Sequence, residues 1–526
     1  MPPVLTHASY DEVPYDAGLS SSTHPQTAAV IGRLFGLRTP DVTNARVLEI
    51  GCGTGNNLLP MAYSLPAATF VGLDLSGRQI AAAQDAAGRL GVRNTRFLQG
   101  DVCEYEPDET FDYIICHGVF SWVPPDARNA ILDVCRRSLS ERGIAHISYN
   151  AMPGWHVRGA FRDMLRAHAR FFGSPQERVE QARAFASFLV ESTGQLTSGA
   201  PSNAAYHAML QEELALIERL PDFYLQHEHL AEDNHPFYFL DFVDELDSHG
   251  LRYLGDANFA SMLTQNLPRE VAASLDETAP TREVLEQYRD FVVDRHFRQS
   301  LVVREEVVLD PHLNAAAVRQ FSVRAALTAP TDGAWHIPQA AGMSRQVESP
   351  LVVSILQTLA DNLPLALSFQ ALYATVDASA WPADIAEDDR ESHLAAVLLS
   401  LFASDAVSLR CWEPALSTTV GQRPSVFLPA RVLDTTLGFP TAHHMLLGFD
   451  SPARWLLPNV DGTRTRDDMV ALLLEQAEQG RISLEGMGPA TSINGDMALS
   501  LVRDGLEQLR RSGMLEAEPP APGDPR

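Results

Sequence analysis

Several features that mark other protein classes are scarce or missing in this chain of 526 residues. It has only five cysteines, at positions 52, 103, 116, 135 and 411, without C-x-x-C spacing. A disulfide scaffold and a zinc site are therefore disfavoured, and a reducing compartment is expected. No apolar run reaches the roughly 20 residues that a membrane-spanning helix needs, and the N-terminus lacks the apolar stretch of a signal peptide. These absences predict a cytoplasmic protein without a transmembrane segment.

Positive charge is also scarce. Lysine and arginine together number 40 against 67 acids, which gives a formal net charge of −27. Nucleic acids are bound through clustered basic side chains, and the sequence has no such cluster, so a nucleic-acid partner is not expected. A negative field would attract a basic protein or peptide, although much of this charge also serves solubility. The sequence contains neither a P-loop nor a Ser-His-Asp signature.

What the sequence does contain is a glycine-rich turn after an apolar run, VLEIGCGTG from Val47 to Gly55. The pattern predicts a buried strand, a tight turn whose backbone approaches a ligand, and the start of a helix. A dinucleotide fingerprint spaces its glycines G-x-G-x-x-G, whereas here Asn56 stands in the place of the last glycine. The E/D-x-G-x-G-x-G form resembles the first motif of class I S-adenosylmethionine (SAM) dependent methyltransferases.

Acids follow the next predicted strands in the same way. Asp74 ends an apolar run that starts at Thr69, and an acid about 20 residues after the first strand is suited to accept from a ribose diol. Asp101 follows a third run, and His117 follows a fourth, Phe111 to Cys116. Strand, helix, strand at this spacing predicts an α/β fold, a Rossmann-like parallel sheet that binds ligands at the carboxyl ends of its strands. The resemblance implies a SAM site formed by Glu49, Gly51, Cys52, Gly53, Gly55, Asn57, Asp74, Leu75, Asp101, Val102 and His117.

Catalytic candidates lie where the fourth and fifth predicted strands end, at His117 and Tyr149. For His117 the alternative is a residue that only orders the cofactor loop. Tyr10, Tyr15 and Trp122 could line the sulfonium and acceptor sites, because aromatic faces attract cations, but core packing is an equal alternative. The N-D-P-P-Y type motif of methyltransferases acting on nucleobase amino groups is absent. The spacing His227-Glu228-His229 on a predicted strand is a weak metal signal, and no metal site is expected.

Further motifs narrow the resemblance. They are Tyr10 to Tyr15, Thr23-His24-Pro25, His117 to Pro124, and Ser148-Tyr149-Asn150 with Pro153-Gly154-Trp155. They resemble a bacterial subfamily that carries a methyltransferase regulatory domain and includes lysine methyltransferases of outer-membrane proteins. The resemblance implies transfer of a methyl group from SAM to a protein side chain, lysine first. A small-molecule N- or O-methyltransferase and a catalytically silent SAM-binding protein are the alternatives, and a homodimer is possible.

The domain organisation is predicted from changes in pattern along the chain. The C-terminal half is expected to be mostly α, with winged-helix-like units that recruit the acceptor, and cofactor binding is expected to need only the first part. The helical segment 175–220 is either an insertion over the active site or a separate domain. The predicted parts are 1–174 (SAM domain, with an N-terminal cap), 175–220 (helical insertion or lid), 221–265 (closing part of the sheet), 266–422 (middle winged-helix-like unit), 423–515 (C-terminal winged-helix-like unit) and 516–526 (disordered tail).

Overall fold

The computed structural model describes most of the chain. The described residues are 18–310, 312–327, 330, 333–338, 343–433, 435, 437–449, 451–481 and 493–517. The predictions made for Tyr10 and Tyr15, and for the tail beyond residue 517, lie outside this range.

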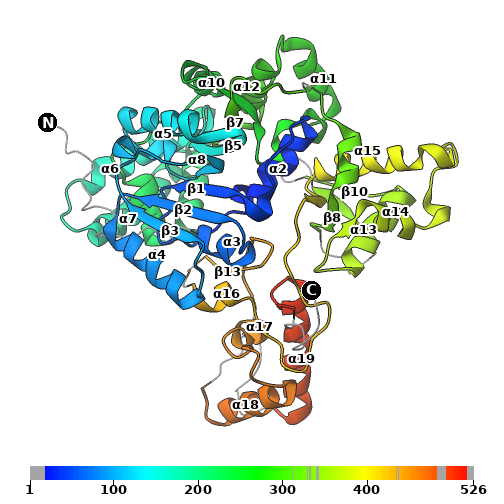
Figure 1. Ribbon diagram of the computed structural model, residues 1–526. Coiled ribbons are helices and arrows are strands. Elements are labelled where there is room, and N and C mark those ends of the chain that lie inside the picture. Colours follow the sequence, from blue (N-terminus) through cyan, green and yellow to red (C-terminus); the bar gives the residue numbers. More distant parts are fainter. Residues whose placement is uncertain are drawn as a thin grey trace.

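The centre of the fold is a seven-stranded sheet in the order β3-β2-β1-β4-β5-β7-β6 (Figure 1). The strands β1 to β5 pair in parallel, and β7 runs antiparallel to both of its neighbours. Their apolar side chains are buried on both faces, as expected for parallel strands covered by helices. The predicted α/β, Rossmann-like fold is confirmed. The strands are β1 (Arg46–Ile50), β2 (Thr69–Asp74), β3 (Thr95–Gln99), β4 (Phe111–Cys116), β5 (Leu139–Asn150), β6 (Leu251–Asp256) and β7 (Phe297–Arg304).

Helices connect these strands and cover the sheet. The helix α4 shows how the local sequence fixes their ends, because Ser76 caps its first turn and Gly91 ends it with a φ of 69°. The helices of this part are α2 (Pro25–Leu34), α3 (Leu58–Ser64), α4 (Gly77–Leu90), α5 (Pro125–Ser138), α6 (Gly154–Ala169), α7 (Pro175–Gly194), α8 (Pro201–Arg219), α10 (Phe239–Ser248), α11 (Arg269–Thr278) and α12 (Arg282–Val293).

The closing strand of the sheet differs from the prediction. We expected the sheet to end by residue 265, but β7 lies within the range assigned to the middle unit and is inserted between β5 and β6. The reason is topological, since an antiparallel strand can join a sheet after a long excursion of the chain without any local signal. Residues 266–304 are therefore part of the methyltransferase-like sheet and its cover.

The helical segment 175–220 forms α7 and α8, which pack with α6 around a small core of their own that includes Phe161 and Leu210. Whether it acts as a lid stays a prediction. The run from Phe223 to His227, expected to be a strand, is helical instead: α9 (Asp222–Tyr224) continues into a π-helix (Leu225–His229).

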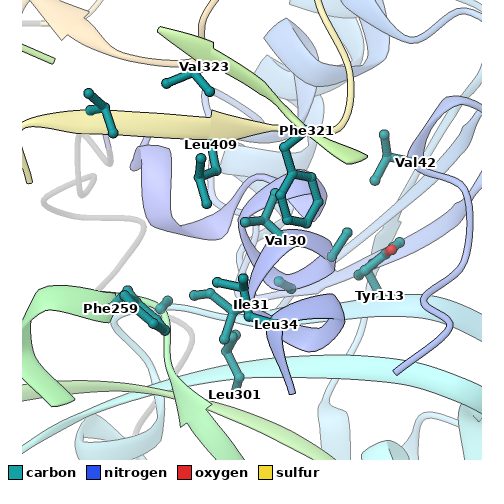
Figure 2. Close-up of a cluster of buried hydrophobic side chains, with 14 of the residues drawn as sticks. Val30, Ile31, Leu34, Val42, Tyr113, Phe259, Leu301, Phe321, Val323 and Leu409 are labelled. Atoms are coloured by element: carbon teal, nitrogen blue, oxygen red, sulfur yellow. The ribbon is translucent and has the colours of Figure 1, made fainter. Parts of the chain in front are cut away.

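The C-terminal half is not separated from the sheet by a polar boundary. The helix α2 lies between the two, and its Ile31 and Leu34 share one buried cluster with Leu301 of β7 and Phe321 of the middle region (Figure 2). The region predicted as a middle winged-helix-like unit contains α13 (Pro350–Asp361), α14 (Phe369–Thr375), α15 (Arg390–Phe402) and β12 (Val407–Arg410). The strand β12 pairs with β8 (Ser322–Ala325), which also pairs with β11 (Leu367–Ser368).

The last part of the chain has its own core, which includes Val426, Leu473 and Leu506. A hairpin of two short strands precedes the helices that enclose this core and extends toward the sheet (Figure 1). None of the helices in the described ranges is both long and apolar enough to cross a membrane. The elements are α16 (Leu428–Val432), β13 (Phe439–Pro440), β14 (Leu446–Leu447), α17 (Ser451–Leu456), α18 (Arg466–Glu478) and α19 (Gly495–Arg511).

Candidate active site

The glycine-rich turn after β1 has the geometry that its sequence predicts. Gly51, Gly53 and Gly55 adopt φ values of 75°, 53° and 75°, a left-handed conformation that other residues rarely adopt. The amide of Gly51 donates to the Leu73 carbonyl at 2.8 Å, so the turn is tied to β2. A Cβ atom at Gly51 would overlap Cγ2 of Val119. The turn therefore holds its backbone close to the carboxyl edge of the sheet.

Two acids flank this turn in different environments. Glu49 is buried, and its Oε1 accepts from Asn57 Nδ2 at 2.7 Å. Burial raises the Glu49 pKa to about 8, although the Asn57 hydrogen bond opposes the shift. Asp74 is half-buried and accepts from the amides of Gly53 (2.8 Å) and Ser76 (2.9 Å). One acid is thus held in the interior under the turn, while the other braces the turn at the end of β2.

The remaining cofactor candidates line the same edge. Asp101 is exposed at the end of β3, and its Oδ1 accepts from the Cys103 amide at 2.9 Å. Leu75 and Val102 are half-buried directly after β2 and β3. Cys52 is buried and its thiol pKa is raised by burial, so it is a packing residue of the turn rather than a nucleophile.

A second cluster lies beyond the end of β4, on the other side of the turn. The His117 ring is 5.4 Å from the ring of His146 on β5 and 5.9 Å from the ring of Phe297 on β7. Burial lowers the pKa of His117 to about 4. Burial, and then the proximity of His117, lower the pKa of His146 to about 3, although Gln299 opposes this shift. Both imidazoles are therefore neutral near pH 7, and this face carries no cation.

The N-terminal segment connects the two clusters. The Ser22 hydroxyl donates to Gln299 Oε1 on β7, beside His146. Ser20 Oγ lies 2.7 Å from Ser22 Oγ, and the Ser20 amide is 3.4 Å from Asn57 Oδ1. Residues 20–22 thus lie between the acidic cluster around Glu49 and the uncharged cluster around His117.

The chain matches three family models in sequence order. They are a methyltransferase domain over residues 47–143, a predicted methyltransferase regulatory domain over 221–304, and a PKMT C-terminal winged helix domain over 423–514. The structure of PKMT2 from Rickettsia typhi in complex with AdoHcy is similar, with a TM-score of 0.82 and 26% identity, over 95% of this chain and 100% of that one.

Two uncharacterized proteins of Rickettsia prowazekii are also similar. RP028 is 35% identical over 247 residues, which are 47% of this chain and 96% of that protein. RP789 is 37% identical over 321 residues, which are 61% of this chain but 57% of that protein. This chain therefore spans little more than half the length of RP789. The chain belongs to the class I SAM-dependent methyltransferases with a methyltransferase regulatory domain.

The turn of this methyltransferase fits its cofactor, SAM. Glu49 Oε2 is buried, and no described residue donates a hydrogen bond to it, so an ammonium group at the turn would find an acceptor there. The Asp74 carboxylate, at the end of β2 beside the turn, is an acceptor of the kind that ribose hydroxyls require. The Asn57 side chain is occupied by Glu49 and by groups on its other side, so it supports Glu49 rather than facing the ligand.

Tyr149 does not lie with His117. Its ring is buried 4.1 Å from the ring of Phe242, and its hydroxyl is 3.3 Å from Ser300 Oγ. Successive side chains of a strand point to opposite faces, so on β5 Tyr149 points away from the face of His146. We therefore assign Tyr149 a packing role instead of the predicted catalytic one. Trp122 is likewise buried against Trp155, with ring centroids 5.7 Å apart.

Among the residues that the structure describes, no group of three or more His, Cys, Asp or Glu side chains could hold a metal ion, and the absence of a metal site stays a prediction. His229 is buried in the π-helix and is not paired with His227 on one face of a strand.

Sequence reasoning missed the residues that topology brings to the site. His146, Phe297 and Gln299 come from β5 and β7, and none is part of a local motif. Ser22 directly precedes Thr23-His24-Pro25, a motif that indicated the subfamily but was not assigned a place in the site. A histidine directly after β4 and another within the neighbouring strand β5 were the one available signal in the sequence.

Proposed function

We propose that this chain transfers a methyl group from SAM to lysine side chains of a protein. The observation that carries the proposal is the uncharged His117–His146 face directly beside the cofactor turn. The similarity to PKMT2, whose structure holds AdoHcy, extends over nearly the whole chain and supports the proposal. So does the match of residues 423–514 to a winged helix domain named for the same proteins.

The chemistry explains why an uncharged face suits a lysine. SAM supplies a methyl group on a sulfonium centre, and the attacking amine must be neutral. A cleft that removes water and offers no carboxylate lowers the pKa of an incoming ammonium. His117 Nδ1 is buried without a hydrogen-bond partner among the described residues and, as a neutral imidazole, can accept from an amine N–H. Attack forms the N–C bond as the C–S bond breaks, and the proton lost by the lysine leaves to water.

The regulatory and winged-helix parts would then bind the acceptor protein. The formal charge of −27 favours a basic protein, because opposite charges steer encounter. A small-molecule acceptor, or a silent SAM-binding role, remains the alternative, since the cofactor residues are the same in all three cases.

The composition of the chain offers a clean assay. All 40 of its basic residues are arginine, and the sequence contains no lysine. Methyllysine found after a reaction therefore belongs to the acceptor and not to the enzyme. Because the enzyme has no lysine, it cannot add methyllysine of its own to the measured signal, and its activity cannot be followed by automethylation on lysine.

The test is incubation of a bacterial lysate with the enzyme and methyl-labelled SAM, followed by mass spectrometry of the digested proteins. We expect label on lysine Nζ of a small set of proteins and AdoHcy release that depends on adding protein. Label confined to small molecules would favour the first alternative, and no AdoHcy release with any acceptor would favour the silent role. The variant Asp74→Ala in the same lysate controls for endogenous methyltransferases.

A homodimer also stays a prediction. Large apolar side chains are exposed on the helical segment 175–220 and just before it, with Phe171, Phe188 and Leu196 at 71%, 57% and 59% exposure. Clusters of such residues are typical of contact surfaces. Sedimentation of the wild type and of Phe188→Glu would test this, a dimer being expected for the first and a shift to monomer for the second.

A further inference from the structure

The C-terminal part of the chain reaches the cofactor turn through one side chain. His444 lies between β13 and β14, and its Nε2 is 2.9 Å from Oδ1 of Asn57. The Nδ2 of the same amide donates to Glu49 at 2.7 Å. A chain of two hydrogen bonds thus joins a residue of the C-terminal half to the buried acid under the glycine turn.

The hairpin is built to hold this side chain. His444 has a φ of 59°, uncommon for a residue other than glycine, and is only 3% exposed. The Thr441 amide donates to Met445 at 2.8 Å and the His444 amide to Thr441 at 2.9 Å, so the turn is closed on itself. The His24 ring lies edge-on to the His444 ring at 5.3 Å. The imidazole is therefore fixed from both sides.

The orientation of the Asn57 amide decides which group donates in the hydrogen bond between His444 and Asn57. Because Asn57 Nδ2 faces the Glu49 carboxylate, Oδ1 must be the acceptor, and His444 donates to it as a neutral Nε2–H tautomer. Burial keeps the imidazole neutral, with a pKa of about 3. The Thr23 hydroxyl (3.0 Å) and the Ser20 amide (3.4 Å) donate to the same Oδ1. His444 is the donor that the C-terminal half adds to them, and together they hold the amide with its Nδ2 toward Glu49.

Other contacts bring the same part of the chain against the helices that follow the turn. Tyr63 of α3 donates to Glu516 at 2.8 Å, and its ring lies 5.5 Å from that of Phe427. Arg89 of α4 donates to the Val432 carbonyl at 3.1 Å. The C-terminal winged-helix unit thus contacts both helices that follow the glycine turn, α3 and α4.

We propose that His444 is a positioning residue of the cofactor site, through which the C-terminal winged-helix unit sets the affinity for SAM and AdoHcy. The inference rests on the cofactor half of the proposed function and is independent of the acceptor's identity. A unit that binds the acceptor and also holds Asn57 couples the two sites, and such coupling is reciprocal.

The test is calorimetric titration of the full chain with AdoHcy. His444→Asn tolerates the positive φ, but its amide is one bond too short to reach, so Kd should rise about tenfold. His444→Gln keeps a donor three bonds from Cβ and should restore Kd to within about threefold of wild type. With protein acceptor, His444→Asn should raise KM for SAM and leave kcat at saturation nearly unchanged.

The neighbouring residue supplies the matched control. His443 is equally buried in the same turn, but its Nε2 lies 2.9 Å from the Pro364 carbonyl and not near the cofactor. His443→Asn should therefore leave the AdoHcy Kd unchanged. Equal weakening by both substitutions, or wild-type affinity in His444→Asn, would overturn the proposal.

A second measurement needs no variant. By reciprocity, saturating AdoHcy should slow amide hydrogen exchange in residues 439–447 of the wild type. Unchanged exchange there would contradict the proposal. If AdoHcy binds as expected but no protein is methylated, the function proposed above fails while the role of His444 stands.

Discussion

The two halves of the active site are built in different ways. The cofactor half comes from consecutive strand ends between residues 49 and 102, and its acids are held by backbone amides and Asn57. The acceptor half gathers Ser22, His117, His146, Phe297 and Gln299, and its rings are neutral. The cofactor site is thus formed by a local sequence motif, whereas the proposed acceptor site is formed by side chains that only the complete topology brings together. Substitutions in the cofactor half should therefore lower the affinity for AdoHcy, whereas substitutions in the other half should lower turnover.

The largest effect is expected at the turn. Gly53 has a φ of 53° and donates its amide to Asp74, so Gly53→Val should strain the turn and fill the space beside the ligand. We expect AdoHcy binding to weaken by more than about 100-fold, with far-ultraviolet circular dichroism near wild type. Gly91→Val is the matched control, since Gly91 has a φ of 69° but no atom within 4 Å of its added Cβ. Loss of fold in Gly53→Val would make this glycine structural.

The acceptor half should respond in turnover rather than in cofactor affinity. For His117→Phe we expect kcat on protein to fall about 100-fold while the AdoHcy Kd stays near wild type. Tyr149→Phe removes only a hydroxyl in the core beside Ser300 and should keep kcat near wild type. If His117→Phe weakens AdoHcy and spares kcat, then His117 orders the cofactor loop and the two halves are not distinct.

A smaller effect is expected at the end of β2. Asp74→Ala removes a charged acceptor for the ribose and the brace of the Gly53 amide. The loss should be about 1–3 kcal/mol of AdoHcy binding, roughly five- to 150-fold in Kd by calorimetry. Asp74→Asn keeps one acceptor oxygen, so its AdoHcy Kd should lie between the values for the wild type and for Asp74→Ala. Unchanged affinity in Asp74→Ala would remove the cofactor assignment of this residue.

The smallest effect is a pH dependence. The free-protein pKa of Glu49 is about 8, so the carboxyl is protonated near pH 7. An ammonium group bound beside it favours the ionised form, and binding then releases a proton. AdoHcy affinity should therefore rise severalfold from pH 6.5 to 8 and then level off. The slope should vanish in Glu49→Gln; a wild-type affinity independent of pH would show that Glu49 does not ionise on binding.

The same contrast explains what the sequence could reveal. The positions of Glu49, Asp74 and Asp101 were predictable because each lies within two residues of the end of its own strand. Gln299 and Phe297 were not, because β7 pairs antiparallel with β5, which ends at Asn150, far back in the chain, and this pairing leaves no local trace. Tyr149 was misassigned because a strand end was identified correctly but the face of its side chain was not. The contact of His444 with Asn57 could not be predicted from the sequence, because the two residues are 387 positions apart.

The C-terminal half shows the limit of domain boundaries drawn from composition. A chain cut after residue 270 was expected to keep cofactor binding, but it would lack β7, which pairs with both β5 and β6. The buried cluster around Ile31 and Phe321 is continuous across the predicted boundary. Cofactor affinity is therefore expected to depend on the whole chain.

The most direct test of the two-half account is a crystal structure of the enzyme with AdoHcy and a lysine peptide taken from a methylated acceptor. The account predicts the sulfur of AdoHcy at the glycine turn and the lysine Nζ between it and His117, beside Phe297. A lysine that enters elsewhere, with His117 and Gln299 remote from Nζ, would contradict it.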